Sequence, residues 1–335
     1  MVSELKGKRI AICGGCGFCG FNLALALKAV GVDVHVVDGF VVNHLATWVA
    51  SNSLYRERYL GFLNGRLTQL RQADIPIHSC DLRDYHRTSQ LLVEIDPQKI
   101  VHLAAVSHAG KSNKDRHEAF ENSILTLKNV QDFAMGAGVE QFVFQSSSMV
   151  YGIFHGRASE EDKLEAIGYY GNYKIAAERM VQAGHQVHKL PYTIVRPSAL
   201  YGAACVSRRV VQVFIEQALA GESLSVAGDG SERLDFTYIQ DWVQGLLLIL
   251  SKTEAINRTF NLAYGGARTL NELVEILRVH FPDLKVEFTG RDPLMPLRDT
   301  LSIEKIQTLL GYCPEYSLER GVSELVAWYK EICHD

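Results

Sequence analysis

The sequence has no apolar run of the roughly 18 residues that a membrane-spanning helix requires; its longest candidate is 245–250. It also lacks an excess of positive charge, because 34 Lys and Arg face 38 Asp and Glu, for a net charge of −4. Internal repeats and low-complexity segments are absent, and the first residues show no signal-peptide pattern. These absences argue against membrane insertion and against general nucleic-acid binding, and we expect a cytoplasmic globular protein.

Cysteine is sparse and odd in number: the chain has seven, and three of them crowd the stretch CGGCGFCG at 13–20. Two sets of residues in this stretch are spaced three apart, the thiols Cys13, Cys16 and Cys19 and the glycines Gly14, Gly17 and Gly20. Three thiolates on one turn leave the fourth ligand of a tetrahedral metal site unspecified. Three such glycines are typical of a turn that binds a diphosphate. We therefore expect a phosphate-binding loop and no metal, with a reactive thiol at the helix start as the alternative use of these cysteines.

The stretch is flanked by the signals of a strand–helix–strand unit. Residues 9–13 form a short apolar run, 21–30 show helical spacing of apolar residues, and 32–37 read as the next strand. In such a unit the backbone amides at the start of the helix bind the diphosphate of a dinucleotide. Asp38 follows the second strand, where a carboxylate accepts the ribose hydroxyls. Because 39–44 offers no Arg or Lys to a 2′-phosphate, we predict NAD rather than NADP.

Three further apolar runs, at 75–80, 99–103 and 141–145, read as strands with helical patterns between them. This alternation indicates an α/β fold with a doubly wound parallel sheet, which binds ligands at the carboxyl ends of its strands. The stretch 40–73 is long for one connection, so we expect one or two additional helices there. Its arginines are expected on a solvated face of those helices: Arg56, Arg58 and Arg66.

The stretch YYGNYKIAAERM contains Tyr170 and Lys174, which are four residues apart and therefore on one face of a helix. A lysine ammonium near a phenol lowers the phenol pKa, so that the phenolate becomes a base near neutral pH. No other tyrosine of the stretch has a lysine at the fourth following position. The pair predicts proton abstraction beside the bound dinucleotide.

Seven motifs occur in the order that is seen in the extended short-chain dehydrogenase/reductases: GGCGFCG, CDLRD, HLAA, SSSMVYG, YxxxK, RPSALYG and GDGSERLDFTYIQD. From about residue 8 to 325 the chain resembles the NAD-dependent nucleotide-sugar epimerases and dehydratases of that family. The resemblance implies a homodimer. It also implies a Rossmann domain and a smaller, mainly C-terminal substrate domain, with bounds of 1–196 plus about 233–262 and about 197–232 plus 263–335.

The same resemblance implies roles for individual residues. Tyr170 is expected as the catalytic base, Lys174 as its partner and a ligand of the nicotinamide ribose, and Ser147 as the catalytic hydroxyl. Further contacts to NAD are implied for Gly14, Gly17, Phe18, Cys19, Gly20, Asp38, Asp81, Leu82, Leu103, Ala104, Ala105 and Asn122. Contacts to the nucleotide-sugar substrate are implied for Ser107, Ser147, Ser148, Arg209, Arg233 and Arg291, with Arg298 as the reserve for Arg291.

Four positions depart from the pattern of the family. Its 4,6-dehydratases carry an Asp-Glu pair where this chain has Ser148 and Met149. Neither of these side chains can exchange the protons that elimination of water requires. Ala199 and Leu234 stand where an asparagine and an arginine usually contact the substrate, which predicts rearranged contacts to the diphosphate.

By elimination, the resemblance favours a nucleotide-sugar epimerase that acts at C4 through a 4-keto sugar. A UDP-sugar or a UDP-uronic acid is the favoured substrate, because the long stretch after Asp38 is similar to that of the uronate 4-epimerases. Two alternatives remain. One is a nucleotide-sugar reductase or dehydrogenase of the same fold, and the other is a non-catalytic protein that senses NAD.

Overall fold

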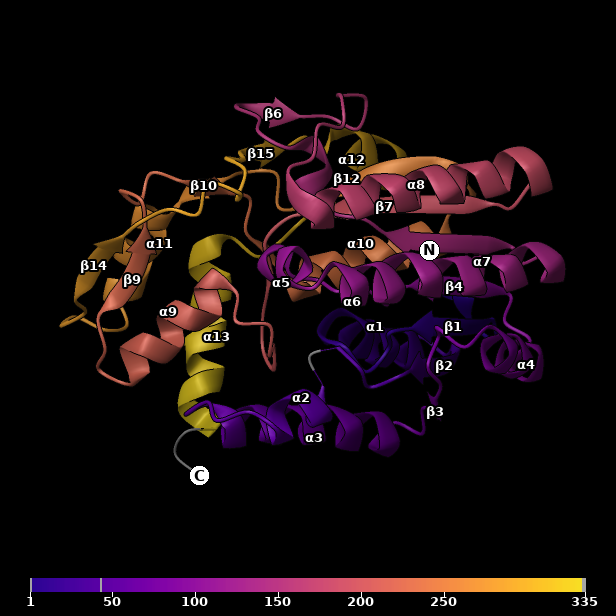
Figure 1. Cartoon of the computed structure of the whole chain (residues 1–335), viewed down its shortest axis with the longest axis horizontal. Helices are drawn as coiled ribbons and strands as arrows, with labels where there is room; N and C mark the ends of the chain where they lie inside the picture. Colours follow the sequence, from indigo (N-terminus) through magenta and orange to yellow (C-terminus); the bar gives the residue numbers. More distant parts are fainter. Residues whose placement is uncertain (1, 43, 333–335) are drawn as a thin grey trace.

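The computed structural model describes residues 2–42 and 44–332, and its centre is a seven-stranded sheet (Figure 1). The strand order is β12-β7-β5-β4-β1-β2-β3, and all neighbouring strands are parallel. The predicted α/β fold with a doubly wound parallel sheet is therefore confirmed. The strands are β1 (Arg9–Cys13), β2 (Asp33–Asp38), β3 (Ile77–Ser79), β4 (Lys99–His102), β5 (Gln141–Gln145), β7 (Tyr192–Pro197) and β12 (Arg258–Leu262).

Helices cover both faces of the sheet, and each face has its own apolar core. Because successive side chains of a strand point to opposite faces, Ile10 of β1 enters one core and Ala11 enters the other. The first core is completed by α1 (Phe18–Ala29), α3 (Arg56–Gln72) and α10 (Ile239–Ser251). The second is completed by α4 (Tyr85–Ile95), α7 (Thr126–Ala137) and α8 (Gly168–His188).

The long connection between β2 and β3 forms two helices, α2 (Leu45–Val49) and α3, as predicted. The expectation for Arg66 is wrong, however, because its side chain is 2% exposed. The physical reason is helical periodicity: Arg66 follows Tyr59 and Leu63 on the stripe of α3 that faces the core. An arginine at this position must enter the interior with its neighbours.

The connection between β4 and β5 begins with two short helices, α5 (Ala109–Lys114) and α6 (Arg116–Phe120). A single π-helical turn, Glu121–Leu125, then joins α6 to α7. Such turns are rare and occur often at functional sites. Here the turn carries Asn122, one of the predicted cofactor contacts, and it lies beside the central cavity.

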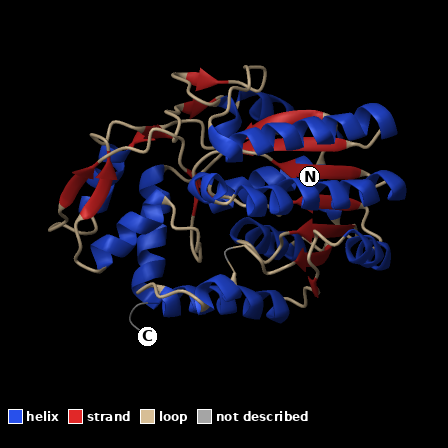
Figure 2. Cartoon of the chain, viewed as in Figure 1, coloured by secondary structure: helices blue, strands red, loops and turns tan. Residues whose placement is uncertain are grey.

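Outside the main sheet the strands are short and pair two by two, as the red arrows of Figure 2 show. The chain leaves the sheet after β7, returns to it through α10 and β12, and leaves again. No helix within residues 2–42 and 44–332 combines the length and the apolarity needed to cross a membrane. The predicted bounds of the two domains stay a prediction. The paired strands are β6 (Arg157–Ala158) with β15 (Thr300–Leu301), β8 (Leu200–Tyr201) with β11 (Thr237–Tyr238), β9 (Leu224–Ala227) with β14 (Val286–Thr289), and β10 (Arg233–Leu234) with β13 (Arg268–Thr269).

A buried carboxylate ties the outer segments to α3. Glu216 lies on α9 (Val210–Leu219) and is fully buried. Its carboxylate accepts hydrogen bonds from the hydroxyl of Tyr59 on α3 at 2.7 Å and from the hydroxyl of Tyr329 on α13 (Leu318–Ile332) at 2.9 Å. Burial, and the carboxylate beside it, raise the pKa of Tyr59, so the phenol stays protonated as a donor. This cluster holds three helices together on one side of the cavity.

Candidate active site

One cavity runs along the carboxyl ends of the parallel strands, and it gathers residues from the whole length of the chain. Most of the predicted site residues line it, together with Arg66, Gln145, Met295 and Arg298. Of the predicted residues, Lys174, Arg233 and Arg291 do not line it. The predicted residues that do are Gly14, Gly17, Phe18, Cys19, Gly20, Asp38, Asp81, Leu82, Leu103, Ala104, Ala105, Ser107, Asn122, Ser147, Ser148, Tyr170 and Arg209.

The glycine loop is shaped so that a diphosphate can approach its backbone. Gly14 has φ +82°, and a Cβ there would lie 2.7 Å from the amide nitrogen of Ala104. A Cβ at Gly20 would lie 2.5 Å from the Cα of Gly15. Gly17 is the N-cap of α1 and no side chain caps it, so the first amides of the helix are left for a ligand. The loop therefore fits the diphosphate of a dinucleotide.

Asp38 lines the cavity at the end of β2. Its carboxylate accepts hydrogen bonds from the amide of Cys16 at 2.9 Å and the amide of Phe40 at 2.8 Å. Burial raises the pKa of this carboxyl group, and the two amides oppose the shift. The bonds hold the carboxylate beside the glycine loop, at the edge of the cavity.

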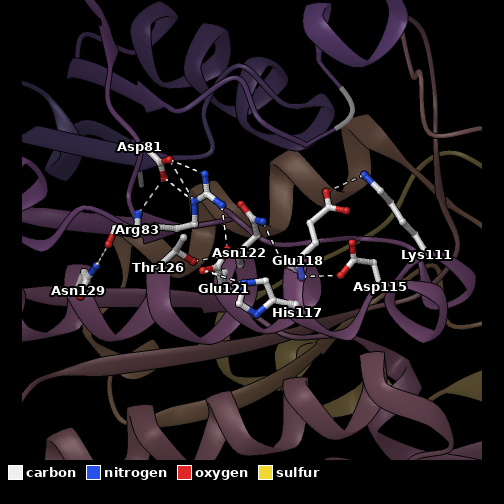
Figure 3. Close-up of polar contacts among 10 residues, drawn as sticks. All are labelled: Asp81, Arg83, Lys111, Asp115, His117, Glu118, Glu121, Asn122, Thr126 and Asn129. Atoms are coloured by element: carbon white, nitrogen blue, oxygen red, sulfur yellow. Dashed lines mark hydrogen bonds and ion pairs between the residues drawn. The ribbon is translucent and has the colours of Figure 1, made fainter. Parts of the chain in front are cut away.

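A chain of polar contacts connects the loop after β3 to the π-helical turn (Figure 3). Asp81 accepts a hydrogen bond from Arg83 at 2.7 Å, and Arg83 also donates to Glu121 at 3.0 Å. The side-chain amide of Asn122 donates to the carbonyl of Glu118 at 2.9 Å. These contacts fix two walls of the cavity, one from each of two distant segments.

Tyr170 and Lys174 lie one turn apart on α8. Tyr170 faces the cavity, whereas Lys174 is buried behind the wall and its Nζ donates to the carbonyl of Gln145 at 2.7 Å. Burial lowers the pKa of Lys174 to about 8, against the opposing effect of Glu178. Burial thus disfavours the charged form of Lys174, while the carboxylate of Glu178 and the carbonyl of Gln145 favour its retention one helical turn from Tyr170.

A buried ion pair fixes the position of α8. Glu178, one turn after Lys174, pairs with Arg196 of β7 at 2.7 Å. Arg196 also donates to the hydroxyl of Tyr151 at 2.9 Å, and that hydroxyl donates to Asn261 of β12 at 2.7 Å. Because both partners of the ion pair are buried, its geometry is well defined. The helix α8 is therefore anchored directly to β7 and, through Tyr151, to β12.

The serines after β5 make different contacts. The hydroxyl of Ser147 accepts a hydrogen bond from the amide of Met149 at 3.2 Å and so caps a short helical turn. The hydroxyl of Ser148 accepts from Nη1 of Arg298 at 3.0 Å. Both serines line the cavity with Tyr170. Ser147 remains free to donate its proton to a ligand, whereas Ser148 is held by a cation.

Two of the predicted substrate arginines do not reach the cavity. Arg233 pairs with Asp299 at 2.9 Å, and Arg291 pairs with Glu232 at 3.5 Å, so carboxylates of the same region hold both side chains. Arg298, which was the alternative candidate for the role of Arg291, lines the cavity instead of it. Arg209 also lines it, and its guanidinium donates to the carbonyl of Ser107 at 2.6 Å. Two arginines therefore face the substrate side of the cavity.

The cysteines of the loop are packed as small buried side chains. Cys13 and Cys16 are fully buried, and burial raises the pKa of all three loop thiols, that of Cys19 to about 12. A raised pKa leaves a thiol protonated and a poor metal ligand. Over residues 2–42 and 44–332, no group of three or more His, Cys, Asp or Glu is placed to hold a metal ion.

We expect that replacement of Cys13, Cys16 and Cys19 together by alanine leaves NAD binding and activity within a few-fold of the native values. The glycines and backbone amides of the loop are unchanged, and the lost packing costs about 1–3 kcal/mol. The measurements are bound NAD, turnover, and metal content of the native protein by mass spectrometry. Stoichiometric zinc or iron that disappears with the thiols would show that the loop is a metal site.

The chain is similar to known proteins over most of its length. The model of the NAD dependent epimerase/dehydratase family matches residues 10–263. The chain belongs to this family. Among similar proteins, the uncharacterized UDP-glucose epimerase YtcB of Bacillus subtilis is 29% identical over 243 residues, which cover 70% of this chain and 74% of YtcB. The dTDP-D-glucose 4,6-dehydratase of Mus musculus is 25% identical over 337 residues, which cover 98% and 90% of the two chains.

A solved structure is similar over almost the whole chain. It is the UDP-glucuronic acid 4-epimerase of Bacillus cereus in complex with UDP-glucuronic acid and NAD, with a TM-score of 0.87 and 25% identity. The match covers 96% of this chain and 99% of that one. The predicted family and the predicted cofactor, NAD, are confirmed by these findings. The family contains both epimerases and dehydratases, so the reaction must be argued from the site.

Proposed function

We propose that the protein is a nucleotide-sugar epimerase that inverts C4 through a 4-keto intermediate. One observation carries the proposal: within the described residues, the only carboxylates that line the cavity are Asp38 and Asp81. Both lie at the ends of strands on the adenosine side, after β2 and β3. Beside Tyr170 the wall consists of Ser147, Ser148 and Met149. A dehydratase needs an acid and a base to remove water. Among the described residues, no carboxylate lines the cavity beside Tyr170 to act as either.

Epimerisation needs less from the protein. Tyr170 takes the proton of the C4 hydroxyl as that oxygen becomes a carbonyl, and it returns the proton when the hydroxyl forms again. Ser147 donates a hydrogen bond to the same oxygen. Lys174 stabilises the phenolate by its charge. NAD, which the glycine loop and Asp38 would hold, would supply a reversible hydride acceptor for C4. Every group is regenerated, so the reaction needs no second substrate.

We further propose that the preferred substrate is a UDP-uronic acid. Arg209 and Arg298 both face the cavity, and no ion pair joins either of them to a carboxylate among residues 2–42 and 44–332. A diphosphate compensates one such cation, and a second negative group of the ligand compensates the other. Arg298 contacts Ser148, which lies next to the catalytic Ser147, so we place the sugar carboxylate there. The similarity to the UDP-glucuronic acid 4-epimerase of Bacillus cereus supports this choice.

The test is conversion of nucleotide sugars by the purified protein without added NAD. UDP-glucuronic acid, UDP-glucose and UDP-N-acetylglucosamine are incubated separately, and the C4 epimers are separated by chromatography. We expect an equilibrium mixture of UDP-uronic acid epimers with no net formation of reduced nicotinamide. Net reduction or oxidation of the cofactor would instead identify a reductase or dehydrogenase. A 4-keto-6-deoxy product would identify a dehydratase, and no turnover of any sugar would favour a protein that senses NAD.

Replacement of Arg298 by methionine is expected to weaken use of the uronic acid more than use of a neutral sugar. A hydrogen bond to a charged group contributes about 1.5–3 kcal/mol, so KM for UDP-glucuronic acid should rise about 10- to 100-fold. The matched control is Arg233→Met, because Arg233 pairs with Asp299 outside the cavity. Equal losses for charged and neutral sugars would place Arg298 at the diphosphate instead.

The homodimer and the cytoplasmic location stay predictions.

A further inference from the structure

A third arginine lines the cavity, beside the glycine loop, and it comes from an unexpected element. Arg66 lies on α3, in the long connection between β2 and β3, and is 2% exposed. Its Nη1 donates to the carbonyl of Cys16, in the glycine loop, at 3.4 Å. Its Nη2 donates to the carbonyl of Ala204. The guanidinium therefore bridges the glycine loop and the segment that follows β8.

Among residues 2–42 and 44–332, no carboxylate forms an ion pair with this guanidinium. Both of its contacts are to neutral carbonyl oxygens, and its Nε is buried without a hydrogen-bond partner among the described residues. The carboxylate of Asp38 is near but is already held by two backbone amides. Burial lowers the pKa of Arg66, as expected for a cation without compensation. A buried, unpaired charge is costly, so the site is built for an anion that the protein does not supply.

The position identifies the anion by its chemistry. Arg66 lines the same cavity as Gly14, Gly17 and Cys19, and it contacts the carbonyl of Cys16 between them. The amides of this loop bind a diphosphate, and a guanidinium binds the same group through its fork of donors. The diphosphate of NAD is therefore the anion whose chemistry fits this position.

The other contact of Arg66 leads to the substrate. Ala204 belongs to the segment 203–209, which ends in Arg209, and Arg209 lines the cavity. Ala204 has φ +58° and Arg208 has φ +48°, both in the left-handed region that non-glycine residues adopt at a cost. A segment with two such residues needs tertiary contacts to hold its shape. The bond from Arg66 is one of these contacts.

We propose that Arg66 is a positioning residue that binds the diphosphate of NAD and holds the segment 203–209, so that bound NAD promotes binding of the nucleotide sugar. When one side chain connects the binding sites of two ligands, each ligand changes the affinity for the other by the same factor. The proposal rests on NAD as the cofactor and on a nucleotide substrate, and it is independent of which sugar is epimerised.

The first experiment compares Arg66→Met, Arg66→Lys and the control Arg58→Met, a change on the same helix at a residue that does not line the cavity. NAD retained after dialysis is quantified, and the affinities for NAD, ADP-ribose and adenosine are measured by calorimetry. With Arg66→Met we expect NAD and ADP-ribose to bind about 10- to 100-fold more weakly and adenosine to bind unchanged. Arg58→Met should match the native protein.

Thermal unfolding separates this role from a purely structural one. Because Arg66 is an uncompensated charge without NAD, Arg66→Met should leave the Tm of the NAD-free protein unchanged or higher, and should reduce the rise in Tm that NAD causes. A lower Tm without NAD, with NAD and adenosine weakened equally, would overturn the proposal. So would unchanged affinity for NAD. If Arg66→Met does not fold, Arg66→Lys decides through the coupling measurement below, since it keeps the charge but lacks the planar fork.

The coupling is measured with UDP as the probe, with and without saturating NAD. We expect NAD to tighten UDP binding in the native protein by about 5-fold or more, and in Arg66→Lys we expect this ratio to fall to about one, because a lysine lacks the fork that bridges two carbonyls. A ratio of one in the native protein would refute the coupling. Failure of the native protein to bind UDP would count against the proposed substrate, whereas the NAD measurements would still test Arg66.

Discussion

Tyr170→Phe is expected to abolish turnover while NAD stays bound. The substitution removes one hydroxyl from a side chain that faces the cavity and keeps the ring that packs there. Removal of a general base typically lowers kcat about 10²- to 10⁴-fold. Lys174 and its bond to Gln145 do not depend on that hydroxyl, so the nicotinamide side of the cavity should be unchanged. The measurements are kcat on the nucleotide sugar and the NAD content of the purified variant.

Tyr173→Phe is the matched control, because Tyr173 lies on the same helix but not in the cavity. Its hydroxyl donates to the carbonyl of Arg116 at 3.4 Å. This variant should retain native turnover. If Tyr170→Phe remains active, or if Tyr173→Phe is the variant that loses activity, the assignment of the base is wrong.

Gly17→Val should remove NAD binding without unfolding the protein. A Cβ at Gly17 would lie 3.2 Å from the carbonyl oxygen of Gly14, its nearest protein atom, so we expect the loop to accommodate it by a small shift. The added side chain stands at the start of α1, where the diphosphate must approach the amides. Loss of two charge-assisted hydrogen bonds costs about 3–6 kcal/mol, which corresponds to an affinity lowered more than about 100-fold.

Gly136→Val serves as the control for the introduction of valine at a helical glycine. Gly136 lies on α7, and nothing lies within 4 Å of an added Cβ. Both variants are compared by calorimetry with NAD and by thermal unfolding without it. We expect similar unfolding temperatures and a loss of NAD affinity in Gly17→Val alone. NAD affinity within a few-fold of native in that variant would mean that the diphosphate does not rest on this loop.

The features predicted correctly are those that depend on neighbours in sequence. The strand at Arg9–Cys13, the glycine loop and the following helix occupy one continuous stretch, and the spacing of its glycines reflects backbone geometry inside that stretch. Tyr170 and Lys174 are also local, because residues four apart share a helix face. The carboxyl ends of parallel strands meet at one edge of the sheet, which is why Asp38, Ala104 and Ser147 line one cavity.

The arginines were predicted least well. Arg66 was expected in solvent, although its place on the stripe with Tyr59 and Leu63 was a signal in the sequence that it would be buried. Arg291 was preferred over Arg298, yet Glu232 holds Arg291 outside the cavity. Arg298 contacts Ser148, which is 150 residues away in the sequence, and no local sequence pattern predicts such a contact.

The sequence by itself determined the doubly wound sheet, the NAD loop, the tyrosine–lysine pair and the missing acid-base pair at Ser148 and Met149, because each follows from residue identity and short-range spacing. Only the tertiary structure decided which arginines line the cavity. A guanidinium stands at the end of a long flexible side chain, and its position depends on which distant carbonyl, hydroxyl or carboxylate the fold brings within reach. For Arg66 these are the carbonyls of Cys16 and Ala204, and for Arg298 the hydroxyl of Ser148.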